Sequence, residues 1–315
     1  YEESLQTMAW AGLSTEQIYL QLVLDDIQAT ADLFKPLYEK TQGGDGYVSL
    51  EVSPLLARNT EDTIAEAKAI WAQVSRPNLM IKVPATDEGI PAIEELIAQG
   101  INVNATLIFS IAQYEKVMDA YIQGLERRLD EGLDVDRVAS VASFFVSRID
   151  TAVDFSLPEP AMRGKVAIAN ARLAYQAYLN KISSERFTAL EKEGAKRQRP
   201  LWASTGTKDP AYSDVLYVDE LVGQNTVNTV PPATLKALLD HGQSDLTIER
   251  ELDASQALID SLNEHGVDLG EITRNLESEG VVKFEDAYNS LLDTIGRKRA
   301  QYVDDLKDLA EPVRS

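Results

Sequence analysis

A chain of 315 residues with 44% hydrophobic content is long enough to bury a full core, and its length fits one large domain better than two ordinary ones. Its 30 basic and 51 acidic residues give a formal net charge of −21, which disfavours nucleic acid and anionic membrane surfaces as partners. The absence of cysteine excludes disulfides, thiolate nucleophiles and cysteine zinc sites, and His241 and His265 are too few for a histidine metal cluster.

The first 46 residues read as helical, and Ser14 with Gln17 has the spacing of a capping box before the amphipathic run 18–34. Short β-rich runs then alternate with helical stretches, which is typical of parallel βα units. Residues from His241 onward form charged helical segments without a convincing strand. The predicted strands are 47–52, 79–84, 101–109, 139–146, 200–205 and 225–230.

This pattern predicts an α/β fold, a (β/α)8 TIM barrel with additional C-terminal helices. We expect a single domain, 1–315, in which residues 1–240 form the βα units of the barrel and residues 241–315 form a helical C-terminal region. A closed barrel needs eight strands, whereas this sequence supplies six. We therefore expect the first two barrel strands to lie upstream of residue 1. No run of about 18 apolar residues and no basic-then-apolar leader is present, so a cytoplasmic protein is expected.

Several polar residues take the parity that points into a barrel. In a strand covered by helices, alternate residues face the interior. This alternation places Lys82 inward, with Glu51 on the preceding strand and Asn104 and Thr106 on the following one. Trp202 also takes the inward parity in its strand, although an aromatic residue in a barrel layer is more often packing than a ligand platform.

An inward lysine has a chemical use as well as a cost. A charged lysine buried without a partner costs several kcal/mol. Losing the proton avoids this cost and leaves a neutral amine that attacks carbonyls, as in enzymes that form Schiff bases. Glu51 is placed to accept or relay protons, directly or through a water held with Thr106. The alternative is a buried Lys82–Glu51 ion pair that only sets the strand register.

Five sequence segments match a known family in order and spacing, and residues 221–235 (LVGQNTVNTVPPATL) extend the match over essentially the whole chain. Together they resemble transaldolases, in particular the long type known from actinobacteria and cyanobacteria. The segments are VSLEVSP (48–54), NLMIKVPAT (78–86), INVNATLIFS (101–110), VASFFVSRID (141–150) and RPLWASTGTKDPAYSD (199–214).

This resemblance implies that the protein transfers a dihydroxyacetone unit in the non-oxidative pentose phosphate pathway. The donor would be sedoheptulose 7-phosphate or fructose 6-phosphate, and the acceptor glyceraldehyde 3-phosphate or erythrose 4-phosphate. Lys82 would form the Schiff base, and Glu51 with Thr106 would position the water used to form and break it. Asn104 and Ser143 would bind the sugar hydroxyls. The resemblance implies neither a metal nor an organic cofactor, because the imine itself is the electron sink.

The resemblance also implies a phosphate site. Arg148 follows Ser143 by five residues, as the family requires, and is the candidate for a charge-assisted grip on the phosphate. Ser204 matches the family serine of the seventh strand. In shorter transaldolases an arginine follows that serine by two positions, but Gly206 stands here. Lys208 is the candidate substitute, and its alternative interpretation is a solvated loop lysine.

Two family motifs are not found in this sequence, namely an aspartate on the first strand and an asparagine in a Thr-Asn-Pro turn after the second. Their absence fits the expected loss of two strands. Two other functions therefore stay open: a class I aldolase of the fructose-6-phosphate type, which releases free dihydroxyacetone, and an inactive barrel fragment. Sugar phosphates are the expected partners, and the sequence leaves a monomer or a homodimer open.

Overall fold

The computed structural model describes residues 1–310, with side chains described up to residue 306. Within this part of the chain, six parallel strands form one sheet in the order β1-β2-β3-β4-β5-β6. Each strand overlaps a range predicted from the sequence, so these predictions are confirmed. The strands are β1 (Val48–Glu51), β2 (Leu79–Pro84), β3 (Val103–Ile108), β4 (Ser140–Phe145), β5 (Arg199–Ala203) and β6 (Val227–Asn228).

The sheet is strongly curled. β1 and β6 stand at its two edges, yet side chains from both strands line the same cavity, which side chains of the four inner strands also line. The result is a mixed α/β fold with a curled parallel sheet, an arrangement compatible with a TIM-like barrel. The carboxyl ends of the parallel strands lie at one edge of this sheet, where the loops that carry ligand-binding residues emerge in such folds.

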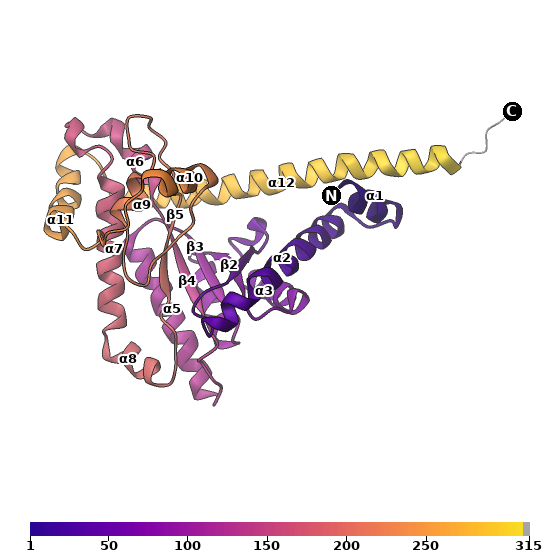
Figure 1. Ribbon diagram of the computed structural model, residues 1–315, viewed down its shortest axis with the longest axis horizontal. Helices are drawn as coiled ribbons and strands as arrows, with labels where there is room; N and C mark the ends of the chain where they lie inside the picture. The colour runs from indigo at the N-terminus through magenta and orange to yellow at the C-terminus, as the bar shows by residue number, and fades with distance from the viewer. Residues whose placement is uncertain (311–315) are drawn as a thin grey trace.

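Helices cover the outer face of the sheet, where Leu79, Ile81 and Val83 of β2 are fully buried. α3, α4 and α5 pack on β2, β3 and β4, and each follows a strand in the chain (Figure 1). These helices are α3 (Thr60–Val74), α4 (Gly89–Ala98) and α5 (Ile111–Asp130). The later helices are α6 (Ser147–Val153), α7 (Val166–Ile182), α8 (Glu185–Lys192), α9 (Leu216–Glu220), α10 (Pro232–His241) and α11 (Leu252–Ser261).

Two segments from opposite ends of the chain form an arm beside the sheet. α1 (Glu2–Trp10) and α2 (Thr15–Lys40) precede β1, and the predicted capping box of Ser14 and Gln17 does start α2. The long helix α12 (Leu269–Ala310) begins over the sheet and runs outward past α1 (Figure 1). A small apolar cluster joins the helices of this arm and consists of Leu5, Ala9, Ile18 and Ile295.

The prediction that Trp202 faces the interior is wrong. The register pairs Ser143 with Leu201 and Phe144 with Trp202, and Leu201 lines the central cavity. Trp202 therefore points to the helix side, where its ring meets Phe144 edge-on with 6.0 Å between the centroids. The pairing with β4 decides the face, because a shift of one residue in the expected phase exchanges the two faces of a strand.

Candidate active site

A cavity of about 570 Å³ lies on the inner face of the curled sheet. Because alternate residues of a strand point to the same side, this face collects one parity from every strand. Five of the residues proposed from the sequence line the cavity: Lys82, Asn104, Thr106, Ser143 and Ser204. The other lining residues are Asp45, Tyr47, Ser49, Met80, Val141, Phe145, Arg199, Leu201, Ala203, Val227 and Thr229.

Lys82 and Glu51 form the charged pair of this face. The register makes them direct partners across β1 and β2, and Lys82 Nζ lies 3.2 Å from Glu51 Oε2. The side chains are 25% and 21% exposed, so the pair is sheltered but remains accessible to a small molecule. A primary amine next to a carboxylate in such a place supplies a nucleophile and a proton acceptor.

Asn104 lies beside Lys82 on the next strand and holds a polar bridge across the sheet. Its Nδ2 donates to Ser49 Oγ at 3.1 Å, and Ser143 Oγ donates to its Oδ1 at 2.7 Å. Asn104 and Ser143 are 5% and 3% exposed, respectively. This bridge fixes the orientation of the Asn104 amide next to the amine. It was not predicted, and its bond to Ser49 joins β3 to β1, which are not neighbours in the sheet.

Two buried oxygen atoms in this region lack a hydrogen-bond partner among the residues that the structure describes. They are Thr106 Oγ1 and Glu51 Oε1. A buried polar atom left unpaired costs roughly 1–3 kcal/mol, so such atoms mark places where a polar ligand or an ordered water belongs. Next to Thr106, the register of β3 shifts and Leu107 takes a positive φ of 61°. A left-handed backbone at a leucine is strained, which is typical of functional sites.

Arg148 and Ser204 lie where the strands β4 and β5 end. Arg148 belongs to the first turn of α6, its guanidinium stacks 5.5 Å from the ring centre of Phe145, and Phe145 lines the central cavity. The Nη1 atom of Arg148 is buried and has no hydrogen-bond partner within the described chain. Ser204, with a φ of 56°, places its Oγ 2.9 Å from Ser147 Oγ at the start of α6.

Lys208 does not line this cavity. It lines a smaller one of about 310 Å³, together with Asp150 and Asp154. Asp150 accepts hydrogen bonds from the Ala167 amide and from the Tyr217 hydroxyl, both at 2.8 Å. Burial nevertheless raises the pKa of Asp150 to about 7, because desolvation of the carboxylate outweighs these two bonds.

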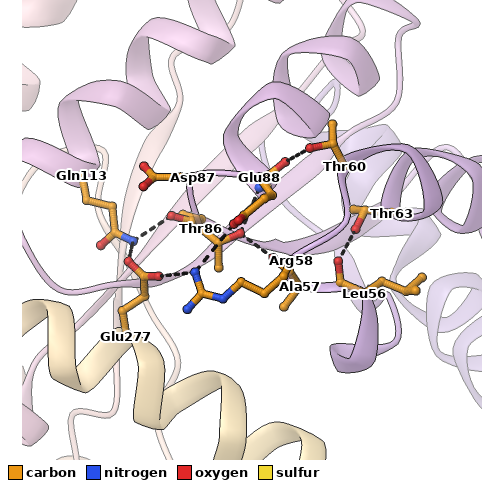
Figure 2. A network of polar contacts seen from close by, with 12 residues as sticks. Leu56, Ala57, Arg58, Thr60, Thr63, Thr86, Asp87, Glu88, Gln113 and Glu277 are labelled. Carbon is orange, nitrogen blue, oxygen red and sulfur yellow. Dashed lines mark hydrogen bonds and ion pairs between the residues drawn. The ribbon is translucent and has the colours of Figure 1, made fainter.

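The part that α12 plays at this site was not predicted from the sequence. Figure 2 shows Glu277 of α12 reaching toward Gln113 and Arg58. Gln113 Nε2 donates to Glu277 Oε2 at 3.0 Å and to the carbonyl of Ala85 at 2.7 Å, and Arg58 lies 3.6 Å from Glu277 Oε1. Burial raises the pKa of Glu277, and Arg58 offsets part of that effect. The signal that was available is Gly280, a glycine inside a helix, which often marks a close approach.

Phe284 follows Glu277 on the same helix, and its ring centre lies 5.8 Å from Lys82 Nζ. Among the described residues, no group of three or more carboxylate or histidine side chains is arranged to hold a metal ion. None of the described helices combines the length and the apolar character that crossing a bilayer requires. The polar groups that line the cavity include the amine of Lys82, the amide of Asn104 and the hydroxyls of Thr106 and Ser143.

The sequence is similar to known proteins over most of its length. Residues 1–295 match the family described as Transaldolase/Fructose-6-phosphate aldolase. The chain belongs to this family. The similarity expected from the short segments thus extends through the βα units and far into α12.

Individual members of the family are similar over nearly the whole chain. A transaldolase of Thermobifida fusca is 50% identical over 309 residues, which cover 96% of this chain and 84% of that protein. A transaldolase of Saccharopolyspora erythraea is 52% identical over 301 residues, covering 94% and 81%. A transaldolase of Trichodesmium erythraeum is 45% identical over 314 residues, covering 95% and 83%.

Proposed function

We propose that this protein is a transaldolase, which transfers a dihydroxyacetone unit between sugar phosphates through an imine on Lys82. The observation that carries this proposal is the 3.2 Å contact between Lys82 Nζ and Glu51 Oε2 on adjacent strands of the inner face. The membership of the family and the names of its similar members support it. The donor is sedoheptulose 7-phosphate or fructose 6-phosphate, and the acceptor is glyceraldehyde 3-phosphate or erythrose 4-phosphate.

The reaction begins when Lys82 passes a proton to Glu51, whose Oε2 lies 3.2 Å from its Nζ, and becomes a neutral amine. The amine attacks the ketose carbonyl, and loss of water gives the imine. The first-strand aspartate of the family would take the proton of the hydroxyl on the fourth carbon and later return it to the oxygen of the acceptor aldehyde. As that proton leaves, the bond between the third and fourth carbons of the ketose breaks, and the aldose leaves as an aldehyde. The electron pair of that bond stays on the three-carbon unit as an enamine. Its carbon attacks the acceptor aldehyde to form a new carbon–carbon bond, and hydrolysis of the resulting imine releases the product and restores the amine.

The other inward residues assist these steps. The water that leaves and returns is held by Glu51 and Thr106, whose unpaired oxygen atoms, Oε1 and Oγ1, are both buried. Glu51 takes a proton from this water when the imine is hydrolysed, and it gives a proton to the departing water when the imine forms. Asn104 and Ser143 bind the hydroxyl groups of the dihydroxyacetone unit, and the bridge between them orients the amide in advance.

The phosphate group binds at the ends of β4 and β5. Arg148 donates to it from the buried Nη1 atom, which has no partner among the described residues, and Ser204 adds a hydroxyl. Lys208 contributes positive charge from the loop after β5. A local cationic site is needed because the formal charge of the chain, −21, otherwise repels a phosphate.

We also propose that the sheet belongs to an eight-stranded barrel, in which two further strands close the gap between β6 and β1 and carry the aspartate and asparagine motifs of the family. The curl that brings both edge strands to one cavity supports this proposal. Residues 1–240 then supply barrel units within a single domain, and residues 241–315, of which 311–315 lie outside the described residues, form its C-terminal region, with helices up to residue 310. The proposed location is the cytoplasm, with sugar phosphates as partners rather than nucleic acid or membranes.

The test is chemical trapping. Borohydride added with fructose 6-phosphate reduces the imine to a stable adduct, which peptide mass mapping locates. We expect the adduct on Lys82, and none in Lys82→Met, whereas the exposed Lys116→Met retains it. An adduct at another lysine would overturn the assignment. Turnover with erythrose 4-phosphate supports the transferase, release of dihydroxyacetone without an acceptor supports the aldolase, and no turnover supports an inactive fragment.

A further inference from the structure

One face of α12 lies on the carboxyl edge of the sheet. Glu277, Gly280 and Phe284 are spaced three and four residues apart, so they share this face of the helix. α12 contacts β3 and α6 directly. The helix therefore passes over the end of the cavity where Lys82 and Thr106 lie.

Two contacts press this part of α12 against the sheet. The Glu277 carboxylate accepts a hydrogen bond from Gln113 and pairs with Arg58, which ties α12 to the first turn of α5 and to the loop after β1 (Figure 2). At Gly280, a Cβ atom would stand 3.0 Å from Leu107 Cδ2, so a larger residue would crowd the Leu107 side chain. The absence of a side chain at Gly280 brings the next turn of the helix close to Lys82.

A third contact holds α12 on the C-terminal side of Phe284. The ring of Tyr288, one turn beyond Phe284, meets Tyr19 of α2 edge-on with 5.3 Å between the centroids. Phe284 lies between these anchors, is partly buried against the core, and has its ring centre 5.8 Å from Lys82 Nζ. An aromatic side chain fixed on both sides in this way is a rigid apolar cover over the amine.

We propose that Phe284 covers the three-carbon intermediate on Lys82 and thereby determines how much of it is passed to an aldose rather than lost to water. This inference rests on the proposed function. The electron pair on the enamine carbon has two fates. It forms a bond to the acceptor aldehyde carbon, whose oxygen then takes a proton, or it takes a proton from water. In the second case, hydrolysis of the imine releases free dihydroxyacetone and the amine.

The cover favours the first fate because apolar bulk over the amine keeps water from the enamine carbon on that side. The water that Glu51 and Thr106 bind approaches from the strands instead, so it can still hydrolyse the product imine. Bulk is what the cover needs, and an aromatic ring is not required. A leucine at position 284 should therefore serve nearly as well as the phenylalanine.

The experiment measures a ratio of two products. Fructose 6-phosphate is the donor, erythrose 4-phosphate is the acceptor at a fixed concentration, and free dihydroxyacetone and sedoheptulose 7-phosphate are both quantified. We expect Phe284→Ala to raise the ratio of dihydroxyacetone to sedoheptulose 7-phosphate on the order of tenfold. Phe284→Leu should keep the ratio near that of the unchanged protein. Val282→Ala is the matched control, because Val282 lies on the same helix and is 51% exposed.

The ratio compares two fates of one intermediate, so partial unfolding of a variant lowers both products and leaves the ratio unchanged. An unchanged ratio in Phe284→Ala, or an equal rise in Val282→Ala, would overturn the inference. Borohydride trapping on the same preparations keeps the two proposals apart. No adduct on Lys82 of the unchanged protein defeats the proposed function, whereas an adduct together with an unchanged ratio defeats only the role of Phe284.

Discussion

Lys82 Nζ lies 3.2 Å from Glu51 Oε2, and the two residues are direct partners in the register of β1 and β2. The contact is local to two adjacent strands, so any change at either residue acts directly on the other. Glu51 keeps its second oxygen buried and without a partner in the described chain. One carboxylate oxygen of Glu51 thus contacts the amine, and the other can bind a water. Proton relay through a water requires this arrangement.

Replacing Glu51 tests that relay. Glu51→Gln keeps the size of the side chain but removes its charge and its capacity to take a proton, so we expect kcat to fall on the order of 100-fold or more. Glu51→Asp, which keeps the carboxylate but shortens its reach, should retain more activity than Glu51→Gln. Steady-state rates with fructose 6-phosphate and erythrose 4-phosphate provide the measurement. A kcat within about twofold of the original in Glu51→Gln would mean that the ion pair only sets the register.

A substitution at Thr106 is expected to change the reaction rate and the stability of the protein in different ways. Its buried Oγ1 has no partner among the described residues, so Thr106→Val removes an unpaired hydroxyl at almost constant shape and should leave the free energy of unfolding equal or higher. In the same variant kcat should fall on the order of tenfold or more, because the water used to form and break the imine would be bound by Glu51 without Thr106. Urea unfolding and steady-state rates measure the two effects.

Thr205→Val is the control for this stability argument. Thr205 is as buried as Thr106, but its hydroxyl donates to Asn228 Oδ1 at 2.7 Å. Removing that hydroxyl leaves the Asn228 oxygen unpaired and should lower the free energy of unfolding by about 1–3 kcal/mol. If Thr106→Val destabilised the protein as much as Thr205→Val, the hydroxyl of Thr106 would be a structural group.

Arg148 is expected to act on the phosphate alone. Loss of a charge-assisted bond of about 1.5–3 kcal/mol predicts that Arg148→Met lowers kcat/KM for fructose 6-phosphate by roughly 10- to 100-fold. Unphosphorylated fructose as the donor should show a much smaller change. Lys208→Met should have a weaker effect than Arg148→Met, since Lys208 lines the separate cavity. Equal losses with the phosphorylated and unphosphorylated donors would show that Arg148 supports the fold instead.

The raised pKa of Asp150 predicts that the stability of the protein depends on pH. Burial raises its pKa in the folded protein from the ordinary 3.8 to about 7, so between these values the folded state holds a proton that the unfolded state has lost. The contribution of Asp150 to the free energy of unfolding is therefore greatest at low pH and falls as pH rises toward 7. A shift of this size corresponds to about 4 kcal/mol.

Asp150→Asn should remove this contribution, because the amide stays neutral and its oxygen can still accept from the Ala167 amide. Urea unfolding of both proteins should therefore show that the Asp150→Asn variant gains stability relative to the original as pH rises from about 5 to about 7. A difference between the two proteins that does not change with pH would contradict the raised pKa. Comparing the two proteins cancels the other titrating groups.

The alternation of residues along the chain was sufficient to predict the six strands and most of the inner face. Lys82, Glu51, Asn104 and Thr106 follow from it because a strand has a strict period of two, and apolar neighbours reveal which face is covered by helices. The same rule failed at Trp202, where the register with β4 decides the face and an isolated strand does not record it.

The sequence by itself thus determined the order of strands, the inward lysine and its carboxylate partner, since these depend on local periodicity and on neighbouring strands. Tertiary structure alone decided that α12 returns over the cavity and that Phe284 approaches Lys82. It also decided that Lys208 lines a different cavity from Ser204. These relationships join residues distant in the chain, and they arise from side-chain packing, such as that of Gly280 on Leu107, which local periodicity does not encode.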